Sequence, residues 1–174
     1  VPMVQAARAS VVLKSMFTFL VLGVSGWTIA QTVQLHYSGK SQKIIIAVAE
    51  SNKILSNPEF YSRINNIQQF DNSTYNGLQI SKEIKNLNKT IEIEGYWNPF
   101  GIANAKTVTV VRLSTTKLRI SNGSLINTIV HETVHAVDFC TNKVLDYTHD
   151  GNKSKEQENT APWVIGAIAE NLAR

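Results

Sequence analysis

The stretch LINTIVHETVHAVD, residues 125–138, carries the strongest structural and chemical signal in this chain of 174 residues. Its apolar residues recur with the 3.6-residue period of an α-helix, which predicts an amphipathic helix packed against a core. The apolar half of the helical wheel holds Leu125, Ile126, Ile129, Val130, Val134 and Val137, and the other half holds Thr128, His131, Glu132, His135 and Asp138. We therefore expect one face of this helix to pack inward and the other to line a site.

His131 and His135 flank Glu132 in the pattern HExxH. Residues four apart lie on the same side of a helix, so two imidazoles with this spacing can bind one metal ion. The adjacent Glu132 can then act as general base on a water molecule. We expect Zn²⁺, with His131 and His135 as ligands and Glu132 as a catalytic residue. The alternative is a structural helix that carries two histidines by chance.

The composition is that of one globular domain with a substantial core, because 43% of the residues are hydrophobic and 17% are charged. The net charge of +4 is mild and forms no stripe of lysine and arginine, so no nucleic-acid partner is expected. The single cysteine, Cys140, argues against an intrachain disulfide framework and against a cysteine-based zinc site.

Residues 16–30, MFTFLVLGVSGWTIA, form the one strongly apolar run, and Arg8 and Lys14 precede it. The run is shorter than the roughly 20 residues of a membrane span and suits the apolar region of a secretory signal. We expect residues 1–35 to be a signal peptide or an N-terminal membrane anchor, with membrane association through residues 15–35. Residues 36–174 would form the domain, secreted or periplasmic. A buried core helix is the alternative for the apolar run.

The rest of the chain predicts both helices and strands. Helical spacing covers residues 41–57, 59–64, 78–87 and 160–172, whereas alternation of β-branched and polar residues predicts strands at 91–97 and 107–113. Residues 98–101 predict a turn between those strands, which we expect to be antiparallel. The expected fold class is α+β, with a small, mostly antiparallel sheet packed on the HExxH helix and a second helix at the C-terminus.

This order of elements resembles the zincin metallopeptidases, specifically the gluzincin branch typified by thermolysin, over residues 90–174. The resemblance implies a minimal zincin-like fold and a third zinc ligand from a glutamate of the second helix, some twenty residues after the motif. Glu158, which lies 23 residues after His135, fits that position. The tail ENTAPW, residues 158–163, also looks like that of small bacterial HExxH domains. Pro162 departs from the pattern, because its ring would clash with the carbonyl of Glu158 inside a helix.

His149 is the alternative third ligand and lies in a polar segment with a turn signal. If Glu158 binds the metal, His149 is expected to donate a hydrogen bond to the oxyanion, and Tyr147 is a second candidate for that role. Asp138, one turn beyond His135, is expected either to accept a hydrogen bond from an imidazole or to be a solvated carboxylate at the helix end.

The expected activity is hydrolysis of peptide bonds in a peptide, protein or peptidoglycan substrate, which an edge strand near residues 107–113 would hold by strand addition. Two alternatives stay open. One is an inactive, membrane-tethered binding module of zincin fold, and the other is a cell-wall amide hydrolase or toxin.

Overall fold

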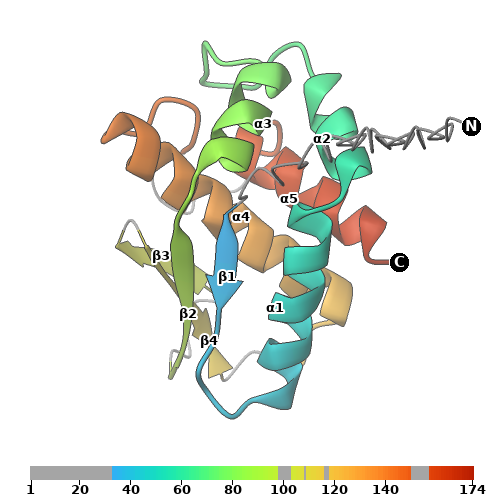
Figure 1. Ribbon diagram of the computed structural model, residues 1–174, viewed down its shortest axis with the longest axis vertical. Helices are drawn as coiled ribbons and strands as arrows, with labels where there is room; N and C mark the ends of the chain where they lie inside the picture. The colour runs from blue at the N-terminus through green and yellow to red at the C-terminus, as the bar shows by residue number, and fades with distance from the viewer. Residues whose placement is uncertain (1–32, 98–102, 108, 116–117, 150–156) are drawn as a thin grey trace, which may run out of the picture.

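The computed structural model describes residues 33–97, 103–107, 109–115, 118–149 and 157–174 (Figure 1). In chain order the elements are β1 (Gln34–His36), α1 (Gln42–Leu55), α2 (Pro58–Asn65), α3 (Gly77–Asn86), β2 (Thr90–Tyr96), β3 (Ala103–Thr107), β4 (Val110–Ser114), α4 (Asn122–Asn142) and α5 (Ala161–Leu172). The predicted mixture of helices and strands is confirmed. The predicted turn at residues 98–101 lies outside the described residues.

Within the described residues the strands form one four-stranded sheet of order β1-β2-β4-β3. Strands β1, β2 and β4 are parallel, and only β3 pairs antiparallel, with β4. The expected antiparallel pairing of residues 91–97 with 107–113 was therefore wrong. Alternating residues fix which side chains face the core, but they do not fix strand direction. The chain places β3 after β2, and β4 then returns beside β2 in the same direction, from Glu92–Val110 to Tyr96–Ser114.

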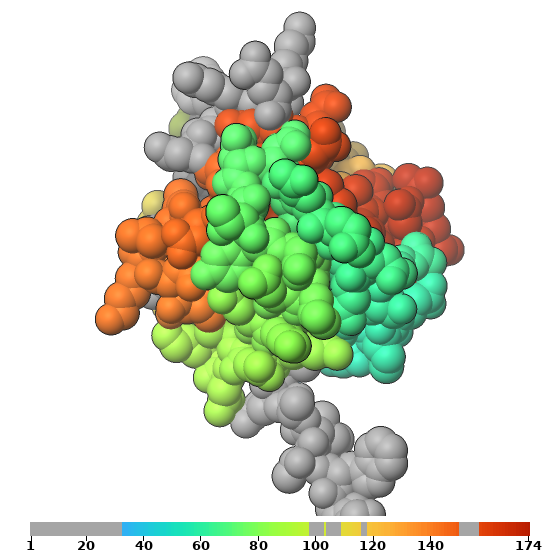
Figure 2. Space-filling model, turned by 90° about the horizontal axis from the view of Figure 1, so that it is seen from above, coloured from blue at the N-terminus to red at the C-terminus, as the bar shows by residue number. Residues whose placement is uncertain are grey.

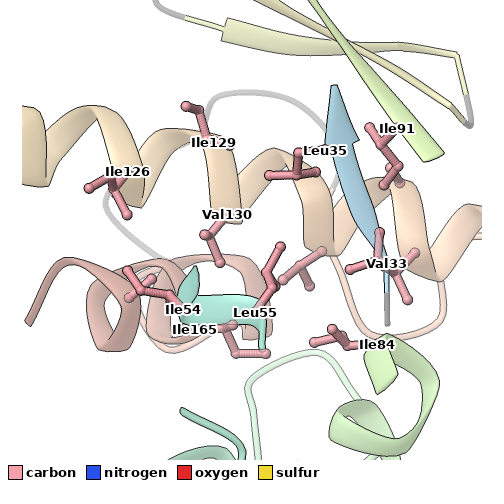
Figure 3. Packing of buried hydrophobic residues seen from close by; sticks show 14 of the residues in the cluster. Val33, Leu35, Ile54, Leu55, Ile84, Ile91, Ile126, Ile129, Val130 and Ile165 are labelled. Atoms are coloured by element: carbon pink, nitrogen blue, oxygen red, sulfur yellow. The ribbon is translucent and has the colours of Figure 1, made fainter. Parts of the chain in front are cut away.

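One face of the sheet is apolar and buried, whereas the other is partly exposed. The buried face presents Ile91, Ile93, Val111 and Leu113. On the other face Glu94 and Arg112 form an ion pair with 3.2 Å between Oε2 and Nε. Helix α1 contacts β1, and α4 contacts β3 and β4, so the helices cover the apolar face. Figure 3 shows side chains from β1, β2, α1, α3, α4 and α5 in this single core.

Helix α4 is the central element, because it contacts the sheet as well as α1, α3 and α5. Its predicted apolar positions are buried, and Ser121 caps its start by accepting a hydrogen bond from the backbone N–H of Ser124. Helix α5 approaches α4 closely at Gly166. A Cβ added there would lie 2.4 Å from Oδ1 and 3.0 Å from the carbonyl oxygen of Asn127, so only glycine fits.

Helices α2 and α3 pack together at one end of the molecule, where α3 contacts α4 and α2 contacts α5 (Figure 2). Asn57 caps α2 and Pro58 occupies its first turn, one residue before the predicted start at residue 59. Helix α3 begins with a capping box in which Asn76 and Gln79 bond to each other's backbone N–H. These caps fix the loop of residues 66–76, which runs next to the start of α5: the backbone N–H of Asp71 donates to the carbonyl of Asn159 over 3.1 Å.

The expected location, secreted or periplasmic with residues 1–35 as a signal peptide or a membrane anchor, is corrected here. Among the described residues no helix combines the length and apolarity needed to cross a bilayer. The apolar run at residues 16–30 itself lies outside the described residues. Strand β1 crosses the predicted boundary at residue 35, and Val33 and Leu35 are both buried in the core. Part of the stretch that was predicted to be a signal peptide or membrane anchor thus belongs to the sheet.

Candidate metal centre

His131 and His135 project from consecutive turns of α4, with their ring centroids 5.1 Å apart. The helix positions them because its opposite side is anchored in the core by residues such as Val130 and Val134. His131 is buried, with 7% of its surface exposed, and His135 is half-buried. The two imidazoles therefore lie on one side of a rigid element, as the spacing predicted.

His149 completes a cluster of three imidazoles. Its ring centroid lies 5.2 Å from that of His131 and 4.6 Å from that of His135. The Nε2 atoms of His149 and His131 are 3.3 Å apart. One ligand nitrogen from each of His131, His135 and His149 lies within 4.8 Å of the others, close enough to hold a metal ion. No other group of three or more histidine, cysteine, aspartate or glutamate side chains in the described part of the chain meets this criterion.

The cluster favours neutral imidazoles. Burial, together with a smaller effect of the neighbouring His149, lowers the pKa of His131 from 6.5 to about 3. Burial likewise lowers the pKa of His135 to about 3, with additional contributions from His131 and His149. A neutral imidazole has a free nitrogen lone pair, which is the form that binds a metal. These side chains are therefore in the ligand state at neutral pH.

Asp138 lies one turn beyond His135 and is fully buried. Its carboxylate does not serve as expected, either as an imidazole acceptor or as a solvated group. Both of its oxygens accept hydrogen bonds from the backbone N–H of Asp146, at 3.3 and 3.0 Å. The N–H of Tyr147 donates to Oδ2 over 3.2 Å, and the side chain of Asn142 donates to Oδ1 over 2.9 Å. The carboxylate therefore binds the segment that leads to His149.

Trp163 is a part of the site that the sequence analysis missed. It lies in the first turn of α5, and its indole meets the ring of His131 edge-on with centroids 4.7 Å apart. It also lies nearly parallel to His149, with an interplanar angle of 15° and centroids 6.4 Å apart. The indole is 37% exposed, so it forms an apolar wall beside the imidazoles that solvent and ligands can reach. The sequence signal that could have indicated Trp163 is its position directly after a proline that starts a helix.

The other residues that were predicted for the site are not members of the three-histidine cluster. Glu132 follows His131 on α4 and is half-buried. Glu158 is exposed, in a turn before α5, and the structure does not bring it into the cluster. Pro162 accounts for this, because α5 begins at Ala161 and cannot extend back to include Glu158. Tyr147 is buried in the core against Tyr75, with ring centroids 5.3 Å apart, and burial raises the pKa of its hydroxyl far above 10.

Comparisons with protein-family models, with curated proteins and with solved structures find no match for this chain. The function proposed below is therefore inferred from the geometry and chemistry of the three-histidine cluster.

Proposed function

We propose that this protein is a zinc-dependent hydrolase of peptide or related amide bonds. His131, His135 and His149 would hold the metal, and Glu132 would be the general base. The observation that carries the proposal is the convergence of three imidazoles, two of them from an HExxH helix, with their ligand nitrogens within 4.8 Å of one another.

The donor set fits zinc. Imidazole nitrogen is a preferred zinc ligand at about 2.0–2.1 Å, and a tetrahedral ion separates two such nitrogens by roughly 3.3 Å. The Nε2 atoms of His131 and His149 are 3.3 Å apart. Three protein ligands leave one coordination position open, which is the arrangement of catalytic rather than structural zinc sites. The proposal keeps the chemistry that the zincin resemblance implies but replaces Glu158 by His149 as the third ligand.

A bound zinc ion supplies Lewis-acid polarisation of the amide carbonyl and of the attacking water. Glu132 would accept a proton from that water and transfer it to the leaving amine, so that the amine departs neutral. Trp163 would limit water access on one side of the imidazoles, because its indole covers His131 and lies beside His149. His149, as a ligand, would not serve as the oxyanion donor.

A substrate added to the sheet next to α4 would pair with β3. Residues 110–114 are paired on both sides, with β2 and with β3, so they form an inner strand. Strand addition near residues 107–113 is thus limited to the edge strand β3, which contacts α4. The polypeptide would then lie along the helix that carries His131, Glu132 and His135.

The test compares the zinc-loaded wild-type protein with Glu132→Gln on casein and on purified cell walls, by measuring newly released amino groups. The wild type should release amines from at least one substrate. Glu132→Gln should reduce the rate about 10²–10⁴-fold, because it removes the general base, and should retain zinc. Glu50→Gln is the matched control: its side chain pairs with Lys53 on the surface of α1, and it should retain full activity.

Two results would overturn the proposal. One is a wild-type protein that binds no stoichiometric zinc, and the other is near-full activity in Glu132→Gln. Amine release from cell walls but not from casein would identify the amide bonds of peptidoglycan as the substrate class.

A further inference from the structure

The third histidine of the cluster does not lie on the helix that carries the other two. Helix α4 is capped by Lys143, whose φ of 63° is in the left-handed region. The residues from there to His149 form no helix or strand. The position of His149 relative to α4 therefore depends on what anchors this segment, because the helix does not fix it directly.

Asp138 is the anchor on α4. It is fully buried, and both carboxylate oxygens accept backbone N–H groups of the segment, from Asp146 and Tyr147, over 3.0 to 3.3 Å. Hydrogen bonds to an ionised acceptor are stronger than neutral ones, and a buried carboxylate without them would be costly. They fix the backbone two and three residues before His149. The burial of Tyr147 against Tyr75 also fixes this part of the backbone.

Asp138 thus connects the segment that carries His149 to the helix that carries His131 and His135. Asp138 lies three residues after His135, so His135 and Asp138 belong to the same helical turn. We propose that Asp138 is a positioning residue that sets the metal affinity of the site by holding His149 within reach of His131 and His135. This inference rests on the proposed function only in taking these three histidines as the metal ligands.

A double-mutant cycle distinguishes this positioning role from a purely structural role of Asp138. If Asp138 acts through His149, its replacement weakens metal binding only when His149 is present. If it only supports the fold, its replacement has the same effect with and without His149. Asn is the suitable replacement, because it preserves the shape but offers one acceptor oxygen where Asp138 uses two.

The experiment measures the Zn²⁺ affinity of the full chain by competition with a chromophoric chelator. The variants are Asp138→Asn, His149→Ala and the double variant. Asp138→Asn should weaken binding about 10–100-fold in the wild-type background, as expected for a group that orients a ligand. In the His149→Ala background it should change the affinity less than about twofold. The Co²⁺-loaded Asp138→Asn protein should also have the visible spectrum of the Co²⁺-loaded His149→Ala protein, because both lose the same ligand.

Asp146→Asn is the matched control. It makes the same chemical change in the segment that Asp138 anchors, but it retains the backbone N–H that donates to Asp138, so it should leave the affinity unchanged. Should Asp138→Asn fail to fold, Asp146→Pro takes its place in the cycle, because proline deletes one of the donor N–H groups from the segment side.

Equal losses from Asp138→Asn in both backgrounds, or no loss in either, would overturn the inference alone. An unchanged affinity in His149→Ala would overturn the proposed ligand set and the inference together. Hydrolytic activity does not enter this measurement, so a protein that binds zinc through His149 but cleaves no amide would leave the inference standing.

Discussion

Two segments meet at the histidine cluster and are built in different ways. Helix α4 places His131 and His135 by local geometry, because residues four apart on a helix share a side. The segment of residues 143–149 has no regular structure and places His149 through hydrogen bonds to Asp138 and through the buried ring of Tyr147. The first arrangement depends on sequence spacing, and the second depends on tertiary contacts.

This difference bears on how the site would respond to change. The imidazoles of α4 are held in place whenever the helix is folded, whereas His149 can move if its anchors are lost. We therefore expect the loss of His131 or His135 to weaken metal binding most. Substitutions that remove His149, or the contacts that anchor its segment, should weaken metal binding less.

The largest effect is expected from His135→Ala, which removes one of the two helical ligands. Zinc affinity should fall roughly a thousandfold, equivalent to about 4 kcal/mol, as measured by chelator competition. His36→Ala is the control, because His36 lies on β1, where it pairs with Glu92 at the surface. Retention of wild-type affinity in His135→Ala would show that α4 does not supply the ligands.

The second effect is a pH dependence of the metal-free protein. Burial lowers the pKa of His131 and of His135 to about 3, below the ordinary value of 6.5 that applies to the unfolded chain. Between these values the unfolded chain binds more protons, so stability is complete above pH 6.5 and falls as the pH decreases. From pH 6.5 to 5 the free energy of unfolding should decrease by about 2 kcal/mol for each histidine.

Urea unfolding in the presence of a chelator, at pH 7 and at pH 5, measures this decrease. The double variant His131→Gln/His135→Gln provides the comparison, since it lacks both buried imidazoles and should lose most of the pH dependence. Identical pH profiles for the two proteins would contradict the burial of neutral imidazoles on α4.

The smallest effect concerns Lys143, where the helix ends and the irregular segment begins. Its φ of 63° is unfavourable for a side chain with a Cβ, and glycine is the preferred residue at this position. Lys143→Gly should raise the free energy of unfolding by about 0.5–1 kcal/mol in urea titrations and leave zinc affinity unchanged. A loss of zinc affinity in this variant would mean that Lys143 itself contributes to the position of His149.

The same division explains what could be predicted from the sequence. The buried face of α4 and the placing of His131 and His135 on one side of it follow from local periodicity and were predicted. The parallel direction of β4 was not, because alternation in residues 107–113 is the same in either direction. Residues 107–113 were also predicted as one strand, whereas β3 ends at Thr107 and β4 begins at Val110.

The third histidine of the cluster could not be predicted from local sequence for a related reason. The spacing of Glu158 from the HExxH motif resembles that of the zincin metallopeptidases. However, α5 begins at Ala161, because Pro162 prevents the helix from extending back to Glu158. His149 has no helical spacing to the motif, and its approach depends on Asp138, whose partners lie eight and nine residues away in the chain. Trp163 meets His131 across the packing of α5 on α4, which is close at Gly166 and which local sequence does not predict.

The most direct test of the three-histidine centre is the zinc affinity and stoichiometry of His149→Ala compared with Glu158→Gln. We expect one zinc ion per chain in the wild type and in Glu158→Gln, with equal affinity, because Glu158 is exposed and outside the cluster. His149→Ala should bind zinc at least about 100-fold more weakly. The opposite result, with binding lost in Glu158→Gln and retained in His149→Ala, would contradict the assignment of His149 as the third ligand.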